Sequence, residues 1–312
     1  MIYLKNRLQR FDKSLFDGGK AMTIAASWVR KIHNCEELVF ISDSRLCGGH
    51  RWDECPKLTT LPGDTCVLAF AGDTEYAYPM MMQIRQAMAG YTRIETRAMD
   101  ITDINGHLLN HANHLMNSVY DLADPNYTPD NEFIFGGYSW VEKKFKIWRY
   151  YYDKHDKSFA KDGKNHRIIS GVSGNFVAIG DQRENFKREL RDLLREKYGN
   201  DIEKQKGIAL DMEPFEALCR MLQKTDKSNT IGGAPQMIKA YQYMNCRPVG
   251  VYWPEKKDVF SNRTLLGRRL FDYEDTKYWF IDPVTLRTNS CDKIEKYDES
   301  ISTYASEEAD CK

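Results

Sequence analysis

Three residues near the start of the chain have the types and the order needed for nucleophilic catalysis without a histidine. Thr23 begins one apolar stretch, Asp43 ends a second, and Lys57 follows shortly afterwards. A threonine hydroxyl is a weak nucleophile that needs a base whose pKa lies near the working pH. An α-amino group, with an ordinary pKa of about 8, meets this need better than a lysine side chain. The order predicts a hydrolase in which Thr23 supplies both nucleophile and base.

Lys57, placed beside Thr23, would act mainly through its charge. Its ammonium group would disfavour protonation of the α-amine and favour loss of the hydroxyl proton. A buried Asp43 would keep that lysine charged and oriented. Each residue also has an ordinary structural explanation. Asp43 could form a surface ion pair with Arg45, worth at most about 1 kcal/mol, and Lys57 could be a solvated side chain.

A free α-amine at Thr23 requires the loss of residues 1–22, which are expected to be an N-terminal extension or propeptide. The chain could cut itself, if the Thr23 hydroxyl attacks the carbonyl of Met22. Alternatively, translation could begin at Met22, whose removal is normal before a small residue such as threonine. If neither event occurs, the protein is a catalytically silent one.

Blocks of strands and blocks of helices alternate along the chain, and these elements must position the three residues. Strands are predicted at 23–29, 38–43, 65–71, 132–137, 144–152, 176–180, 236–243 and 248–253. Helices are predicted at 74–91, 103–124, 181–198 and 214–224. This order predicts an α+β fold, a four-layer αββα sandwich of two antiparallel sheets flanked by helices.

Seven short motifs follow one another along the chain: Thr23-Ile24-Ala25, Ser42-Asp43-Ser44-Arg45, Lys57-Leu58, Ala71-Gly72-Asp73-Thr74, Phe135-Gly136-Gly137, Ala178-Ile179-Gly180 and the segment from Asp226 to Gly233. Taken in this order, they resemble the proteasome-type subunits of the N-terminal nucleophile hydrolases, including the bacterial two-ring protease forms. They span 23–253, the expected hydrolase domain, and their shared order carries the likeness rather than any single motif.

The resemblance implies a role for five residues. Thr23 would be nucleophile and base, Asp43 and Lys57 the charged pair beside it, and Asp226 and Ser228 the completion of the hydrogen-bond network around the α-amine. From the residues alone, Asp226 and Ser228 could equally form a turn.

The resemblance also implies an oxyanion-stabilising backbone amide, near Gly48-Gly49 or near Ala71-Gly72. The register at the nucleophile has two alternatives. The family usually has isoleucine third, which would make Met22 the terminal residue, whereas the other register puts Thr23 first and Ile24 second. Methionine in the first position could not attack.

Asp181 stands where the family pattern has a serine. It could accept a hydrogen bond from the threonine amine, or it could cap the helix that follows. Ser170 and Ser173, slightly upstream, could supply the missing hydroxyl.

Composition narrows the remaining functional classes. The 312 residues include 45 basic and 45 acidic side chains, so no general attraction to nucleic acid is expected. The first 22 residues lack an apolar signal core, and no run approaches the ~18 apolar residues of a membrane span. A cytoplasmic protein without membrane contact is expected. His107, His111 and His114 share one helix side but lack a metalloprotease motif, so neither metal nor cofactor is expected.

Residues 254–312 are expected to form a C-terminal extension with an acidic, disordered tail. Within it, 271–286 could add a hairpin to the body or cover a neighbour. Because proteasome-type subunits pack through their outer helices into rings, the resemblance implies a homo-oligomer acting on a peptide or protein substrate, with an unfoldase as a further candidate partner.

These observations together predict a threonine-type hydrolase that cleaves peptide or amide bonds through an acyl ester on Thr23. Two alternatives remain open: a catalytically silent subunit that serves in binding or assembly, and a small-molecule amidase on the same scaffold.

Overall fold

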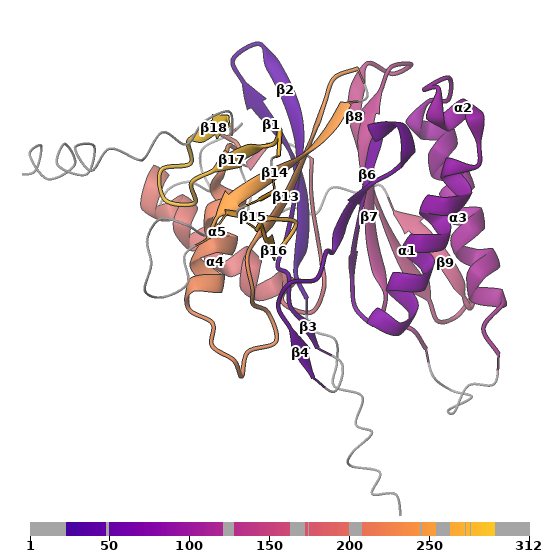
Figure 1. Cartoon of the computed structure of the whole chain (residues 1–312), viewed down its shortest axis with the longest axis horizontal. Helices are drawn as coiled ribbons and strands as arrows, with labels where there is room; N and C mark the ends of the chain where they lie inside the picture. Colours follow the sequence, from indigo (N-terminus) through magenta and orange to yellow (C-terminus); the bar gives the residue numbers. More distant parts are fainter. Residues whose placement is uncertain are drawn as a thin grey trace, which may run out of the picture.

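Two β-sheets dominate the computed structural model (Figure 1). It describes residues 23–47, 50–120, 128–162, 172–173, 175–199, 208–243, 245–253, 263–271, 273–274 and 276–290. The predicted extension at 1–22 and the predicted tail lie outside these residues, as do Gly48, Gly49 and Ser170.

The larger sheet has nine strands among the described residues, and the candidate site lies at the ends of some of them. Its main path runs β11 (Phe176–Ile179), β1 (Ala25–Ile32), β2 (Cys35–Ser42), β13 (Gln236–Tyr241), β14 (Asn245–Tyr252), β15 (Arg263–Leu265) and β16 (Arg268–Arg269). Two further strands, β17 (Trp279–Ile281) and β18 (Thr288–Ser290), join this sheet at β14. Strand β17 runs parallel to β14.

The smaller sheet has five antiparallel strands. They are β5 (Leu58–Thr60), β6 (Cys66–Ala71), β7 (Glu132–Ser139), β8 (Lys144–Asp153) and β9 (Ser158–Asp162). Two short pairs complete the strands: β3 (Leu46–Cys47) with β4 (Arg51–Trp52), and β10 (Val172–Ser173) with β12 (Ile208–Ala209).

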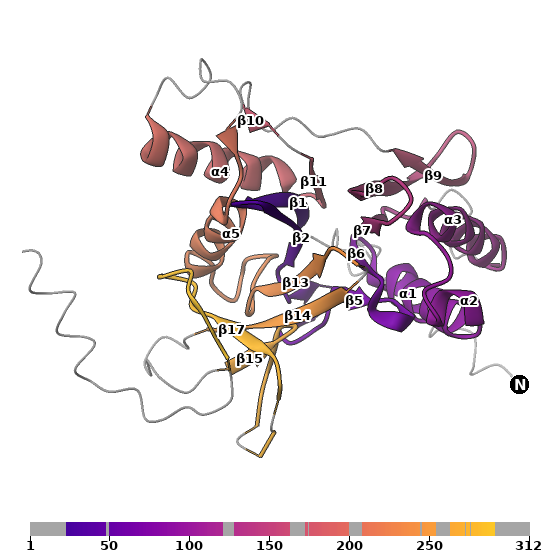
Figure 2. The same ribbon diagram turned by 90° about the horizontal axis from the view of Figure 1, so that it is seen from above.

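The helices lie in two groups, one beside each sheet (Figures 1 and 2). Their bounds are α1 (Thr74–Ala89), α2 (Thr92–Glu95), α3 (Ile101–Asn117), α4 (Arg183–Tyr198) and α5 (Glu213–Gln223), with a short 3₁₀ turn at Pro62–Asp64. The first three pack with the smaller sheet, and α4 and α5 pack with the larger one. None of the helices that the structure describes is long and apolar enough to cross a bilayer.

The parts of β1 and β2 nearest Thr23 and Asp43, Ala25–Trp28 and Leu38–Ser42, are buried on both faces, which is why most of their residues are apolar. Successive residues of a strand point to opposite faces. Val39 and Ile41 therefore pack with α4 and α5, whereas Leu38 and Phe40 pack against the smaller sheet. The apolar stretches after Thr23 and before Asp43 thus form a rigid, doubly covered strand pair.

The predicted four-layer αββα sandwich of two antiparallel sheets is wrong. The molecule consists mostly of antiparallel strands with few helices, and the larger sheet is mixed because of the parallel β14–β17 pair. Figure 2 shows α4 and α5 beside β1 and β2, with β15 and β17 further along the sheet. The additional strands lie after residue 253, where buried Thr264 and Phe280 pair with β14. Of the two alternatives for 271–286, the one in which it adds to the body agrees with the pairing of β17 with β14 and β18.

Element positions follow the predicted ones closely where the apolar period is clear. The helix predicted at 103–124 instead begins at Ile101, because the Asp100 carboxylate accepts a hydrogen bond from the Thr102 amide (3.0 Å). It ends at Asn117. The last predicted strand, 248–253, is the second half of β14.

Candidate active site

The ends of four strands meet at one edge of the larger sheet, and this edge carries the candidate nucleophile. Ala25 at the start of β1 lies opposite Ser42 of β2 and Ile179 of β11. Ser42 in turn lies opposite Gln236 at the start of β13. Residues just outside these strands are therefore brought together although they are far apart in the sequence.

Thr23, Asp43 and Lys57 lie in contact at this edge. The Lys57 Nζ is 2.7 Å from Asp43 Oδ1 and 3.3 Å from Thr23 Oγ1. All three side chains are buried, with 2% of Thr23 and none of Asp43 or Lys57 exposed. The ammonium group thus lies between a carboxylate and a hydroxyl, the arrangement that the register with Thr23 first requires.

Backbone amides hold the Asp43 carboxylate in place. Its Oδ1 accepts from the Ile24 amide (3.3 Å), and its Oδ2 accepts from the amides of Arg45 (3.1 Å) and Gly232 (3.2 Å). Burial raises the pKa of Asp43, and the charge and hydrogen bond of Lys57 oppose this effect. These hydrogen bonds offset part of the desolvation cost of burying the Asp43–Lys57 charge pair.

Gln236 fixes the backbone on both sides of the charged pair and was missed from the sequence. Its Oε1 accepts from the Lys57 amide (3.0 Å), and its Nε2 donates to the carbonyls of Asp43 (3.0 Å) and Cys55 (2.8 Å). The side chain is fully buried. Its position at the start of the strand predicted at 236–243 was the one signal in the sequence.

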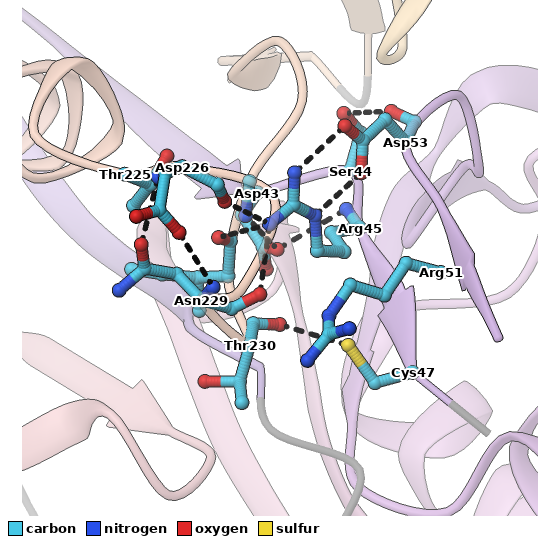
Figure 3. Close-up of polar contacts among 12 residues, drawn as sticks. Asp43, Ser44, Arg45, Cys47, Arg51, Asp53, Thr225, Asp226, Asn229 and Thr230 are labelled. Atoms are coloured by element: carbon cyan, nitrogen blue, oxygen red, sulfur yellow. Dashed lines mark hydrogen bonds and ion pairs between the residues drawn. The ribbon is translucent and has the colours of Figure 1, made fainter. Parts of the chain in front are cut away.

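Arg45 connects the end of β2 to the loop that precedes β13 (Figure 3). Its guanidinium makes a bidentate ion pair with Asp53, with N–O distances of 2.5 and 2.8 Å. Its Nη1 donates to the carbonyls of Asp226 (2.7 Å) and Asn229 (2.8 Å). A Cβ on Gly232 would lie 2.4 Å from the guanidinium carbon, so this close packing depends on glycine.

Asp226 and Ser228, the other two predicted site residues, lie in this loop. The Asp226 carboxylate accepts a hydrogen bond from the Ser228 amide (2.7 Å) and another from the Ser228 hydroxyl, an arrangement typical of a turn. Figure 3 shows Asp226 turned toward Asn229, on the far side of Arg45 from Cys47. The structure brings three of the five predicted residues together, and it connects Asp226 to Asp43 through Arg45.

Asp181 contacts the nitrogen of Thr23. That nitrogen donates to Asp181 Oδ1 over 2.7 Å. Helix α4 begins at Arg183 with Gln182 at its N-cap position, so Asp181 precedes the cap. Burial raises the pKa of Asp181, an effect that the Thr23 N–H opposes. Of the two roles considered for Asp181, the geometry favours contact with the nitrogen.

Gly180 allows this contact. Its φ of +96° lies in the left-handed region, and a Cβ there would lie 2.0 Å from the Thr23 carbonyl oxygen. The Gly180 amide donates to Glu132 Oε2 (2.9 Å). The turn between β11 and α4 is therefore pressed against Thr23 and anchored to β7.

A cavity of about 350 Å³ adjoins Asp181. Gly180, Asp181 and Ala71-Gly72 line one part of it, and Arg149 and Tyr151 line another. Of the two predicted oxyanion segments, Ala71-Gly72 therefore lies on the cavity wall, while Gly48-Gly49 is outside the described residues. Thr23, Asp43 and Lys57 are not among the residues that line this cavity; Asp181 connects it to the Thr23 nitrogen.

Other candidate chemistries gain no support. Burial raises the pKa of the Cys55 thiol, near Lys57, to about 11, so it is protonated at neutral pH and is a poor nucleophile. In the part of the chain that the structure describes, no group of three His, Cys, Asp or Glu side chains is placed to hold a metal ion. His107 lies against the ring of Tyr91, with 5.6 Å between ring centroids.

The chain aligns with solved structures of Anbu at low similarity. Anbu from Hyphomicrobium sp. strain MC1 is 15% identical with a TM-score of 0.47, and the alignment covers 72% of this chain and 87% of that one. The Anbu complex from Pseudomonas aeruginosa, described as a helical assembly, is 15% identical with a TM-score of 0.49, covering 76% and 89%. At this level neither structure informs the chemistry of this chain.

Sequence comparisons give no relative. No model of a protein family matches the chain, and no curated protein matches it. The assignment to the proteasome-type family, drawn from ordered short motifs, is therefore wrong as stated. Those motifs consist of residues that are common at strand ends and turns, so their order alone did not establish membership.

Proposed function

We propose that the protein is a threonine-type N-terminal nucleophile hydrolase that cleaves amide bonds once Thr23 is the first residue. The observation that carries the proposal is the position of Lys57 Nζ, 3.3 Å from the Thr23 hydroxyl and 2.7 Å from the Asp43 carboxylate. A fully buried ammonium group favours the deprotonated form of an adjacent hydroxyl.

The reaction has two halves, formation of the acyl ester and its hydrolysis. In each half a proton moves to the α-amine and then leaves it. The α-amine of Thr23 takes the hydroxyl proton while Oγ1 forms a bond to the substrate carbonyl carbon, whose oxygen becomes an oxyanion. The carbon–nitrogen bond then breaks, and the α-ammonium returns the proton to the leaving amine. Water attacks the resulting ester by the same route and releases a carboxylic acid, which restores the Thr23 hydroxyl.

The site residues would divide into two groups. Thr23 and Lys57 would act at the reacting atoms and Asp43 would hold Lys57, whereas Asp226 and Ser228 would support the Asp43 carboxylate through Arg45. Residues 1–22 would be the extension whose removal frees the amine, and 23–253 would carry the site. The proposed substrates are peptides or proteins. The proposed assembly is a homo-oligomer, and an unfoldase is the candidate partner that would deliver unfolded substrate to it.

Two alternatives each have a supporting observation. Thr23 is only 2% exposed, which suits a silent protein that keeps the extension and serves in binding. The cavity of about 350 Å³ would also accept a small amide, which suits an amidase.

Intact-mass spectrometry of the purified protein separates the active from the silent alternative. We expect a mass that begins at Thr23; a chain that retains Met1 contradicts the proposed hydrolase. Rates on peptides compared with small amides that share one acyl group then separate a peptidase from an amidase.

A further inference from the structure

We infer that Asp181 forms an ion pair with the α-ammonium group of Thr23 and so sets the pH range in which that amine acts as the base. This inference rests on the proposed function, because the amine exists only after the bond to Met22 is lost. In the intact chain the same nitrogen is an uncharged amide. Loss of that bond leaves a titratable nitrogen 2.7 Å from a carboxylate oxygen.

The position of the Asp181 carboxylate is fixed by rigid elements on both sides. Ala25 of β1 pairs with Ile179 of β11, so the residues that precede β1 and follow β11 lie together. The Gly180 backbone approaches the Thr23 carbonyl too closely for a side chain at position 180, and its amide is anchored on Glu132. Asp181 is thus built into the site rather than carried on an independent loop.

The other charged groups around this nitrogen have partners of their own. Lys57, on the hydroxyl side of Thr23, pairs with Asp43 (2.7 Å); Glu132, behind Gly180, pairs with Arg149 and with Arg183 (3.2 Å); and Glu184, at the start of α4, pairs with Lys187 (2.9 Å). The other carboxylate oxygen of Asp181, Oδ2, accepts a hydrogen bond from Gln182 Nε2 over 3.1 Å. Asp181 is therefore the carboxylate in direct contact with the nitrogen.

The sign of the effect follows from charge. A carboxylate stabilises the ammonium form and raises the pKa of the amine, whereas the Lys57 ammonium acts in the opposite direction. Since the free amine is the base, activity falls on the acid side as this amine becomes protonated. Asp181 also stabilises the ammonium that forms when the amine takes the hydroxyl proton. Removing its charge should therefore shift the acid limb to lower pH and reduce the rate on the plateau.

The test compares Asp181→Asn with wild type after mass spectrometry has verified that both begin at Thr23. Asparagine keeps the shape and one acceptor oxygen for the Thr23 nitrogen, removes the charge, and replaces the oxygen that Gln182 contacts with an NH2 group. We expect the acid limb of kcat/KM to move down by about 1 pH unit, with a lower plateau rate. The amine pKa, measured without turnover from the pH dependence of Thr23 acetylation by acetic anhydride, should move down equally.

Asp192→Asn is the matched control, because it makes the same change at a carboxylate of α4 that pairs with Arg195 (3.5 Å) and does not line the cavity. It should leave both pH profiles unchanged. An amine pKa that is the same in wild type and Asp181→Asn overturns the inference. If the asparagine variant does not fold, Asp181→Ser supplies the same comparison.

The two proposals can fail separately. A chain that begins at Thr23 and is inactive contradicts the proposed hydrolase, yet its amine pKa still tests Asp181. An active enzyme whose amine pKa ignores Asp181 contradicts only the ion pair. A chain that never frees the amine contradicts both.

Discussion

Thr23 owes its candidate role to two contacts on opposite sides. Its hydroxyl lies 3.3 Å from Lys57 Nζ, and its nitrogen donates to Asp181 over 2.7 Å. The first contact favours loss of the hydroxyl proton, and the second favours an amine that can receive it. A threonine elsewhere on a strand end would have neither.

Substitution at Thr23 tests the nucleophile. Thr23→Ala removes the hydroxyl, so amide hydrolysis should fall to background, whereas Thr23→Ser keeps a hydroxyl and should retain measurable activity. Steady-state rates on one peptide amide check both. If the 1–22 extension is lost by self-cleavage, the alanine variant should also keep it in an intact-mass measurement. Equal rates in wild type and Thr23→Ala would exclude Thr23 as the nucleophile.

The buried pair of Asp43 and Lys57 predicts an asymmetric cost in stability. Lys57→Met leaves a fully buried carboxylate without its counter-charge, which should lower the free energy of unfolding by about 3–5 kcal/mol. Lys57→Met with Asp43→Asn removes both charges and should be less destabilised than the single variant. Urea unfolding of wild type, Lys57→Met, Asp43→Asn and the double variant gives the comparison, and additive losses would show that the two side chains are not coupled.

The sequence indicates residues whose side chains could react or carry charge, but not the residues that only hold them in position. That Thr23, Asp43 and Lys57 lie together could be predicted, because a nucleophile, a carboxylate and an amine in this order suggest a mechanism; their catalytic role stays a prediction. Gln236 could not, because a lone glutamine reveals its role only when three backbone groups converge on it. For Asp181 the sequence left two roles open, and the hydrogen bond from the Thr23 nitrogen together with the helix start at Arg183 distinguishes them.

At the scale of elements, the site depends on turns that press against one strand end. The turn between β15 and β16 is one of these, because a Cβ on Gly267 would lie 2.3 Å from the Cβ of Ser44, next to Asp43, and 3.2 Å from Gln236 Nε2. Gly267 also has a φ of +83°. Residues beyond 253 therefore reach the back of the candidate site.

Gly267→Ala should destabilise the protein by roughly 1–3 kcal/mol, because it adds both a steric clash and left-handed strain. It should also lower kcat more than it changes KM, since the displaced Ser44 adjoins Asp43. Gly106→Ala in α3 is the matched control: no atom lies within 4 Å of its added Cβ, and alanine favours a helix by up to ~1 kcal/mol. Thermal unfolding and kinetics of both variants check this. A Gly267→Ala protein as stable as wild type would rule out close packing at this turn.

Strands and long helices were predictable because apolar period and length decide them locally. The pairing of β14 with β15 and β17 was not predictable, because it depends on contacts between strands that are separated in the sequence. Gly250 illustrates this: its missing side chain makes room for the Phe280 ring, which a Cβ would meet at 2.3 Å. Nothing in the local sequence around Gly250 identifies that partner.

At the scale of the molecule, strands β15, β16, β17 and β18, all after residue 253, are part of the larger sheet. Truncation after Trp253 would leave β14 without β15 and β17 and would expose apolar core next to Val251. We expect the truncated chain to show a lower unfolding midpoint in urea and a tendency to aggregate, since an uncovered strand edge pairs with other chains. A truncated protein as stable as the full chain would show that this segment is dispensable.

The most direct test of the central claim is covalent labelling by a β-lactone, followed by intact-mass and peptide-mapping mass spectrometry. A nucleophilic hydroxyl opens the lactone and adds its whole mass, with no leaving group. We predict one adduct per chain, on Thr23, in protein that begins at this residue, and none in Thr23→Ala or in chains that retain Met22. Protein that begins at Thr23 and gains no adduct, or an adduct that persists in Thr23→Ala, would contradict the account.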